Sequence, residues 1–196
     1  QTLKTEEKIV KYLDIPIQHG SDRVLKMMNR RDNKAGIIAL VKKLRENIPG
    51  IVLRTTVMVG FPGETKEDFI ELCELLRLLK FDRLGVFAFS SEEGTAAALL
   101  TDSVTKRTKE RRAEIVMSEQ AVRAGIKNET KLGEIIEVLV EGFDKLAGCF
   151  FGRSAADAPE VDGKVFFTAD VKPAEGQYIK VKINEVVDYD LFGEMV

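Results

Sequence analysis

The sequence predicts a chain of two parts, an α/β region of parallel βα units followed by a small all-β barrel. Strand-like and amphipathic helical segments alternate through residues 1–131, an order that is typical of βαβ units around a parallel sheet. Five short β-rich segments then follow one another without a helical segment, which indicates a closed or nearly closed five-stranded barrel. We therefore predict one domain at residues 1–131, which includes a connecting helix, and a second at residues 132–196.

Three strands are predicted in the first domain, at residues 12–17, 51–60 and 82–90. The middle strand is so rich in β-branched residues that we expect it to be buried in a parallel sheet. Three βα units are too few to close an α/β barrel, which needs eight. We therefore expect the first domain to be the later part of a larger α/β domain.

Two amphipathic helices separate these strands. We expect Asn33 to cap the first of them, and Thr65 with Asp68 resembles a capping box at the start of the second. A long, strongly charged helical segment at residues 102–131 follows the third strand, and we expect it to pack along the outside of the first domain. Its apolar stripe is thin and consists of Ile115, Val122 and Ile126.

The second domain is punctuated by glycine and proline, which end strands and permit turns. Its predicted strands are residues 134–140, 149–152, 165–169, 178–186 and 191–196.

Charge is distributed unevenly between the two domains. Residues 132–196 hold six basic and thirteen acidic side chains, a net charge of −7, whereas the rest of the chain holds 24 basic and 19 acidic side chains, a net charge of +5. Such an asymmetry bears on partners and encounter rates rather than on fold. The simpler alternative is that the acidic domain is only a well-solvated surface.

The sequence also argues against several classes of protein. It contains no apolar run near the roughly 20 residues that span a bilayer, and residues 1–10 lack the apolar region of a secretory signal. Cys73 and Cys149 are too few for a disulfide framework, which favours a reducing compartment and a cytoplasmic location. Two cysteines and one histidine, all widely spaced, predict no metal site built from this chain alone.

Polar residues follow each predicted strand of the first domain, and ligands of parallel α/β folds bind at this edge. Gln18 and Ser21 follow the first strand, and Arg54 lies in the second. Arg54 could pair with a ligand carboxylate, while Gln18 or Ser21 could accept a hydrogen bond from an ammonium group.

Each of these residues also has a purely structural interpretation. Ser21 could only cap a helix, Gln18 could only satisfy backbone groups, and Arg54 could form a structural ion pair. His19 has no nucleophile or second histidine nearby, so a surface or packed histidine is the better interpretation. We expect Cys73 to be part of the core.

An acidic segment at residues 152–163 distinguishes the second domain. Asp157, Glu160 and Asp162 share it with one guanidinium, that of Arg153, and we expect the carboxylates to face that group. Barrels that hold RNA carry basic residues because they bind phosphates. The sign of this segment therefore argues against a nucleic-acid backbone as its target.

With these residues in view, the chain resembles the radical S-adenosylmethionine (SAM) methylthiotransferases. The segments 12–31, 53–65 and 81–95 resemble the family's TIM-like barrel, and residues 132–196 resemble its TRAM domain, an OB-like barrel. Residues 60–65 resemble the loop that approaches the adenosine part of the cofactor. The resemblance implies that SAM is bound, and the cofactor contacts it implies are Gln18, Ser21, Arg54, Gly60 and Phe89.

The resemblance also implies the chemistry. A 4Fe–4S cluster reductively cleaves SAM, the resulting 5′-deoxyadenosyl radical abstracts a hydrogen from the target carbon, and a second 4Fe–4S cluster contributes sulfur that becomes methylated. The family binds the first cluster through three closely spaced cysteines, and this chain has no such triplet. We therefore assign no catalytic residue or metal ligand here and predict that the chain alone is inactive.

The acidic segment most resembles the branch that modifies the β-carbon of an aspartate in the twelfth protein of the small ribosomal subunit. A barrel of charge −7 would attract such a basic protein and repel tRNA. We expect Arg153, Asp157, Glu160 and Asp162 to bind this protein substrate.

Two alternatives stay open. The chain could belong to a tRNA-modifying methylthiotransferase that binds RNA through a local basic patch of Lys172, Lys180 and Lys182. It could also be a non-catalytic binding fragment in which the α/β region serves only as a scaffold.

Overall fold

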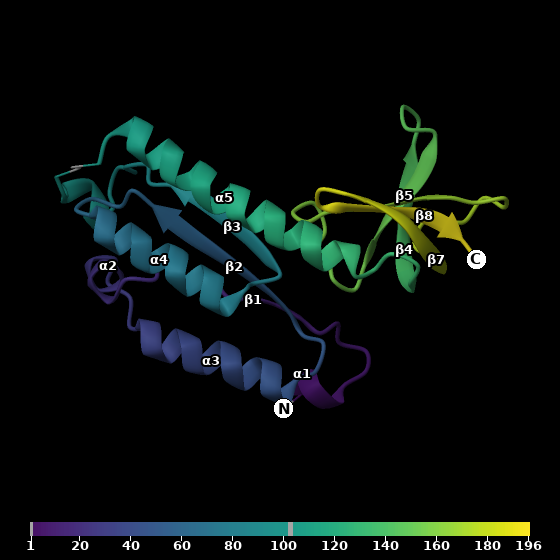
Figure 1. Cartoon of the computed structure of the whole chain (residues 1–196), viewed down its shortest axis with the longest axis horizontal. Coiled ribbons are helices and arrows are strands. Elements are labelled where there is room, and N and C mark those ends of the chain that lie inside the picture. The colour runs from purple at the N-terminus through teal and green to yellow at the C-terminus, as the bar shows by residue number, and fades with distance from the viewer. Residues whose placement is uncertain (1, 102–103) are drawn as a thin grey trace. The chain divides into compact units, whose positions relative to one another are not determined.

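The computed structural model describes residues 2–101 and 104–196. It contains two compact units that divide between Gln120 and Ala121, within the long helix α5 (Lys106–Glu129) (Figure 1). The first unit holds a parallel sheet and the second a closed barrel. Both parts of the predicted fold class are confirmed.

The first unit is built from short βα repeats. Its strands β1, β2 and β3 form one parallel sheet in that order. The elements are α1 (Thr2–Thr5), β1 (Tyr12–Asp14), α2 (Asp22–Met27), α3 (Lys34–Asn47), β2 (Val52–Val59), α4 (Lys66–Leu79), β3 (Arg83–Ala88) and the short 3-10 helix η1 (Ala96–Leu99).

Strand β1 is shorter than predicted, because Pro16 has no N–H to continue the ladder. The backbone rejoins the sheet at Gln18, which forms an isolated parallel bridge with Val57 of β2. This bridge places the segment after β1 beside the carboxyl end of β2.

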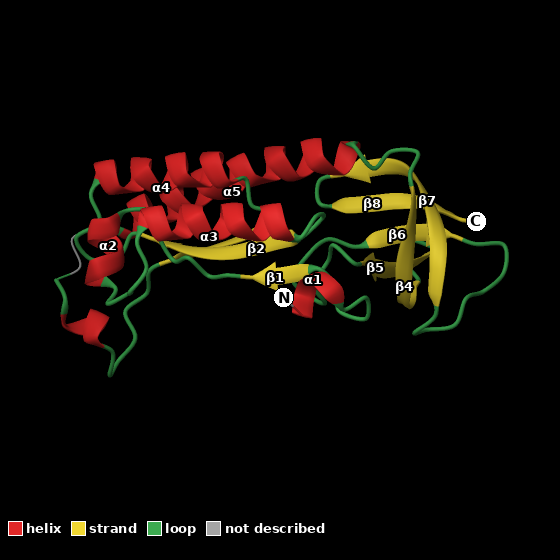
Figure 2. Cartoon of the chain, turned by 90° about the horizontal axis from the view of Figure 1, so that it is seen from below, coloured by secondary structure: helices red, strands yellow, loops and turns green. Residues whose placement is uncertain are grey.

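The core of the first unit lies on one face of the sheet. Helices α3 and α4 cover this face in Figure 2, and Leu53 and Val57 of β2 are fully buried beneath them. The alternate residues of β2, such as Thr56 and Met58, are only half-buried. The strand is therefore covered more completely on one side than on the other, which its apolar composition did not predict.

Both predicted helix caps are confirmed. The Asn33 side chain accepts a hydrogen bond from the Gly36 amide at 2.8 Å, at the start of α3. Thr65 and Asp68 form a reciprocal capping box at the start of α4.

Helix α5 buries a different face from the one predicted. Ile115, Val122 and Ile126 are all exposed, so their assignment as the packing stripe is wrong. The buried positions in the later part of this helix recur every four residues and consist of Val116, Gln120, Ala124 and Asn128, and Lys109 is also buried near its start. Polar members are tolerated there because they are hydrogen-bonded, as Gln120 is to the Phe81 carbonyl at 3.2 Å. The predicted start of this helical segment, at residues 102–103, lies outside the described residues.

The second unit is a closed barrel with strand order β4-β5-β6-β8-β7, in which β6 and β8 pair in parallel and the other neighbours are antiparallel. Its core is apolar and includes Val138, Phe167 and Val181. A Cβ at Gly152 would overlap the Leu139 carbonyl oxygen, so the β4–β5 contact requires glycine. The strands are β4 (Ile135–Asp144), β5 (Cys149–Ser154), β6 (Val165–Thr168), β7 (Tyr178–Val187) and β8 (Asp190–Met195).

None of the helices in the described part of the chain is long and apolar enough to cross a bilayer.

Candidate functional site

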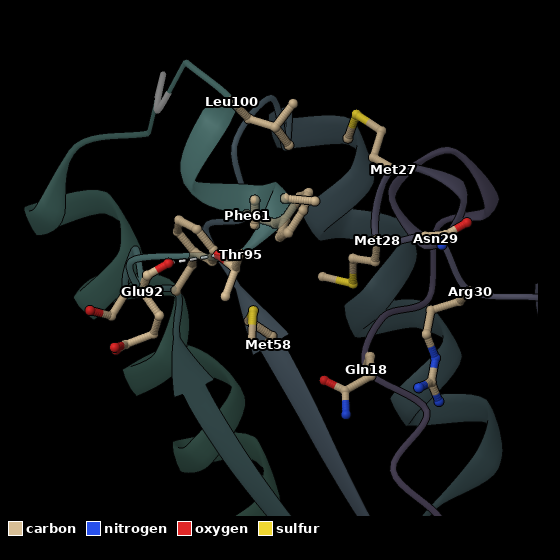
Figure 3. A pocket seen from close by; sticks show the side chains of 14 residues that line it. Gln18, Met27, Met28, Asn29, Arg30, Met58, Phe61, Glu92, Thr95 and Leu100 are labelled. Atoms are coloured by element: carbon tan, nitrogen blue, oxygen red, sulfur yellow. Dashed lines mark hydrogen bonds between the residues drawn. The ribbon is translucent and has the colours of Figure 1, made fainter.

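A cavity of about 470 Å³ opens at the carboxyl ends of β2 and β3, the edge at which parallel sheets bind ligands. Figure 3 shows Met27 and Met28 on one side of this cavity and Glu92 on the other, with Met58 and Phe61 between them. Its apolar lining includes Met27, Met28, Met58, Phe61 and Phe89, and its polar lining includes Gln18, Asn29, Arg30, Ser90 and Glu92.

Two aromatic rings from neighbouring strand ends form part of the wall. Phe61 and Phe89 meet edge to face with their ring centroids 5.3 Å apart, and both are largely buried. Met58 packs against this pair. Thioethers and ring faces suit a flat, polarizable ligand group such as a heteroaromatic base.

Two polar residues of the lining have left-handed backbone conformations, Gln18 with φ 67° and Asn29 with φ 56°. Such conformations are uncommon for residues other than glycine and occur often at functional sites. The Gln18 backbone is held by β2, because its N–H donates to Thr56 O at 3.0 Å and its carbonyl accepts from the Met58 amide at 2.8 Å. This pairing leaves the Gln18 side chain available to the cavity.

The loop after β2 is held by a buried carboxylate, that of Glu64. One of its oxygens accepts hydrogen bonds from the amides of Gly60, at 2.5 Å, and Phe61, at 3.2 Å. The other accepts from the Arg112 guanidinium of α5 at 2.6 Å. The Glu64 side chain is 0% exposed, so this network fixes the Phe61 wall without contact with water.

His19 links the loop after β1 to the same carboxylate. It is fully buried, its Nδ1 accepts from the Ser21 amide at 3.0 Å, and its Nε2 lies 3.6 Å from the Glu64 carboxylate. The packed alternative for His19 is therefore confirmed, and its packing joins the two loops that carry Gln18 and Phe61.

Lys109 of α5 holds the end of β3. It is 93% buried, its Nζ donates to the Phe89 carbonyl at 3.3 Å, and the same atom lies 4.9 Å from the centre of the Phe89 ring. Its aliphatic stem fills the space beside Gly60, where a Cβ would overlap it. Gly60 also has φ +73°, so any side chain there would be strained for two reasons.

Asp68 fastens the segment after β1 to the start of α4. Its carboxylate accepts from the Ser21 hydroxyl at 2.7 Å and pairs with the Arg23 guanidinium. Burial raises the pKa of the Asp68 carboxyl, but the hydrogen bonds from Arg23, Ser21 and Thr65 outweigh burial and hold that pKa well below its usual range.

The predicted cofactor contacts fall into two groups. Gln18 and Phe89 line the cavity, whereas Ser21, Arg54 and Gly60 are not among its lining residues. Ser21 occupies the N-cap position of α2 but makes no side-chain cap hydrogen bond, because its hydroxyl donates to Asp68. Arg54 forms an ion pair with Asp14 at 2.9 Å, which is the structural alternative considered for it.

The acidic segment of the barrel is arranged differently from the expectation. Arg153 forms an ion pair with Glu141 of β4, a partner that was not predicted. Asp157 is buried and accepts from the Ser154 hydroxyl at 2.6 Å, so it shapes a turn. Asp162 accepts from the Ala158 amide at 2.8 Å. Glu160 is exposed and is thus the member of the set best placed to meet a partner.

Sequence reasoning missed the residues that organise the cavity, namely Glu64, Lys109 and Arg112. Glu64 lies in the loop that was singled out, between Gly63 and the capping residue Thr65, but nothing in the sequence shows that its carboxylate turns inward. Lys109 and Arg112 lie three residues apart on α5, in a run of charged residues that reads as a solvated face.

Comparison with known proteins finds a matching family model in each of the two units. Residues 2–76 match the family model of the radical SAM superfamily, and residues 132–196 match that of the TRAM domain. Coproporphyrinogen III oxidase (HemN) from Escherichia coli, a radical SAM enzyme, superposes with a TM-score of 0.50 at 22% identity, over 59% of this chain and 27% of that chain. This likeness concerns the fold alone and agrees with the predicted radical SAM barrel.

Curated relatives match nearly the whole chain. Ribosomal protein uS12 methylthiotransferase RimO of Pelotomaculum thermopropionicum is 52% identical over 96% of this chain and 43% of the relative. Proteins of the same name from Acetivibrio thermocellus and Geotalea uraniireducens are 44% and 46% identical, over 99% and 100% of this chain. The chain spans less than half the length of these relatives, 43–44%.

Proposed function

We propose that this chain is part of a radical SAM methylthiotransferase, an enzyme that adds a methylthio group to the β-carbon of an aspartate in ribosomal protein uS12. The observation that carries this proposal is the 52% identity to a uS12 methylthiotransferase across both units, the one with the cavity and the barrel. A relative that shared only the α/β unit would support the proposed cofactor but not the proposed partner, and one that shared only the barrel would support the partner but not the cofactor.

The cavity fits SAM as its cofactor. SAM combines an adenine ring, ribose hydroxyls and a charged amino-acid end. The Phe61 and Phe89 rings with the Met58 thioether offer an apolar wall for the adenine. Gln18 and Glu92 offer acceptors for hydroxyl and ammonium protons.

When bound, SAM with two 4Fe–4S clusters would supply the methyl group and the radical chemistry, and we place the cluster ligands outside this chain. The chain's own residues would orient the cofactor and exclude water from it. Glu64 and Lys109 hold Phe61 and Phe89 from behind, so the wall does not depend on the ligand for its shape. Cys73 lies on the buried face of α4, which leaves it unavailable as a cluster ligand.

We propose further that the acidic barrel docks the basic protein substrate and that tRNA is disfavoured. The net charge of −7 supports this, since opposite potentials speed encounter and like charges suppress wrong partners. Glu160 gives the clearest test of this hypothesis. Substitutions of Asp157 or Asp162 would also remove hydrogen bonds that hold the turn together.

The test is a salt titration of binding, with purified uS12 and with unmodified tRNA in separate experiments. We expect binding to uS12 that weakens as salt rises, and only weak binding to tRNA. Glu160→Ser should weaken uS12 binding about two- to fivefold, as expected for a charge at the rim of an interface. Thr130→Ser, an exposed change in the turn directly after α5, should not change it. Tight tRNA binding with a steep salt slope would overturn the uS12 assignment.

The chain's inactivity is tested separately, by incubating it with SAM, iron, sulfide and a reductant. We expect no 5′-deoxyadenosine, because the chain has only two cysteines and they are widely spaced. Formation of 5′-deoxyadenosine would contradict this part of the proposal.

A further inference from the structure

The outer surface of the barrel carries a row of aromatic side chains. Phe151, Phe166 and Phe192 are in register on the neighbouring strands β5, β6 and β8, which lie side by side in Figure 2. The Phe166 and Phe192 rings stack at 5.2 Å with an angle of 17° between their planes, and Phe151 follows at 6.4 Å. All three are half-buried, whereas their neighbours Val165 and Phe167 point into the core. The three rings of this row are therefore not part of the packed core of the barrel.

A cation already occupies one end of this row. The Lys164 ammonium lies 4.5 Å from the centre of the Phe151 ring, within the range of a cation–π interaction. Gly142 on the neighbouring strand leaves room for this ring, since a Cβ there would come within 3.0 Å of Phe151 Cζ. The half-buried Phe151 ring thus already holds a positive charge.

The other end of the row borders a pocket of about 240 Å³. Phe166 and Phe192 line it on β6 and β8, and Glu185 lines it on β7 as the register partner of Phe192. Among the described residues that line the pocket, Glu185 is the only charged one, and Asn184 and Thr168 add polar groups. Within the part of the chain that the structure describes, no hydrogen bond or ion pair engages the exposed Glu185 carboxylate. Glu185 directly follows an irregularity in the pairing of β7 with β8, whose register shifts between Ile183 and Glu185. Such irregularities often redirect a side chain.

We propose that this pocket binds an arginine side chain of a protein partner. A guanidinium is planar, so it can stack against a phenylalanine ring while its N–H groups donate to a carboxylate. Glu185 supplies the carboxylate, Phe192 supplies the ring, and the Asn184 and Thr168 side chains can accept remaining protons. A nucleic-acid phosphate would instead meet the negative charge of Glu185 and find no cation in the lining.

The charge of the barrel selects the same class of partner. Its net charge of −7 favours a basic protein segment, and the adjacent cross-strand pair of Lys182 with Glu194 is neutral as a pair. The identification of that partner as uS12 rests on the proposed function. The chemistry of the pocket does not, so the two can fail independently.

The first experiment uses this chain labelled with ¹⁵N and ¹³C and a blocked tripeptide, acetyl-Gly-Arg-Gly-amide, followed by NMR. We expect saturable shifts at Phe166, Phe192 and Glu185 with the arginine peptide. The matched citrulline peptide, which has the same shape without the charge, should bind at least about tenfold more weakly. Equal shifts with both peptides, or shifts that avoid these residues, would overturn the proposal.

Two variants separate the contributions. Glu185→Gln should weaken binding of the arginine peptide about tenfold, because it removes a charge-assisted acceptor. Phe192→Leu should weaken it about threefold, because it keeps an apolar side chain and removes the ring face. Glu175→Gln, the same change of charge at an exposed position outside the pocket, should leave peptide binding unchanged, and a loss equal to that of Glu185→Gln would contradict a specific site.

The same variants are then measured with uS12. A loss of uS12 affinity in Glu185→Gln that matches the loss for the peptide would support the pocket as part of the docking surface. If the wild-type chain binds the arginine peptide at the pocket but does not bind uS12, the proposed partner is wrong and the arginine site stands. If uS12 binds and Glu185→Gln has no effect, the role of the pocket in docking is refuted.

Discussion

The two units of this protein bury polar groups in opposite ways. In the α/β unit, His19, Glu64, Asp68 and Lys109 are all buried, and they gather behind the loops that follow the strands. In the barrel, the cluster of core side chains is apolar, and the buried Asp157 lies in a turn. These four side chains are therefore buried where loops must be held in one shape, whereas the strands of the barrel obtain their shape from backbone pairing.

The largest expected effect is a loss of stability in the barrel that leaves the stability of the α/β unit unchanged. Phe167→Ala removes a 99% buried ring and should lower the free energy of unfolding of the barrel by about 3–5 kcal/mol. Native-state hydrogen exchange should show this loss at Val138 and Val181, with little change at Leu53. Phe143→Ala, at an exposed position on the same barrel, serves as the control. An equal loss of protection in both units would show that they do not respond separately.

The second prediction breaks the polar network of the α/β unit. Glu64→Ala leaves the mostly buried Arg112 guanidinium and two loop amides without their carboxylate acceptor, so it should destabilise this unit by about 3 kcal/mol. Thermal unfolding measures this effect, and calorimetry with SAM should show weaker binding as the Phe61 wall loosens. Glu67→Ala, an exposed change three residues away, is the control. Normal stability in the Glu64 variant would contradict a structural role for the network.

The smallest expected effect is a difference in acid sensitivity. The pKa of the Asp68 carboxyl is lowered by folding, so its contribution to stability is complete above the usual carboxyl pKa near 4 and is lost as the pH falls below that value. Asp68→Asn should lower stability at neutral pH by about 1.5–3 kcal/mol and flatten this acid limb. Denaturant titrations between pH 7 and pH 2.5 provide the measurement. A variant with the same acid limb as the wild type would show that another group is responsible.

The fold followed from local patterns to a large degree. The order of the strands, the caps at Asn33 and Thr65 and the closed barrel are confirmed. The caps and the individual strands were predictable because each depends on residues close together in the sequence. The failure at α5 has a physical cause. Its buried face contains Gln120 and Asn128, whose side-chain N–H groups donate to backbone carbonyls of distant segments, and apolar periodicity cannot reveal such partners.

The candidate site was predicted in position but not in detail. The ends of parallel strands locate a ligand edge, and Gln18 and Phe89 do line the cavity there. Ser21 shows why the other contacts could not be predicted. A serine suits both a helix cap and a partner for a carboxylate, and the carboxylate that it contacts, that of Asp68, lies 47 residues away in the sequence. In the sequence, the methionines that line the cavity could equally be residues of the hydrophobic core, and only the folded structure distinguishes these two roles.

The place of β8 in the barrel has a consequence for the order of folding. This strand lies between β6 and β7 and pairs with both, so those two strands cannot meet without it. The sheet of the α/β unit can grow stepwise, since each strand pairs with the next one along the chain. The barrel must instead wait for its final strand while β6 and β7 present unpaired edges, which makes this interval the one most exposed to misassembly between nascent chains.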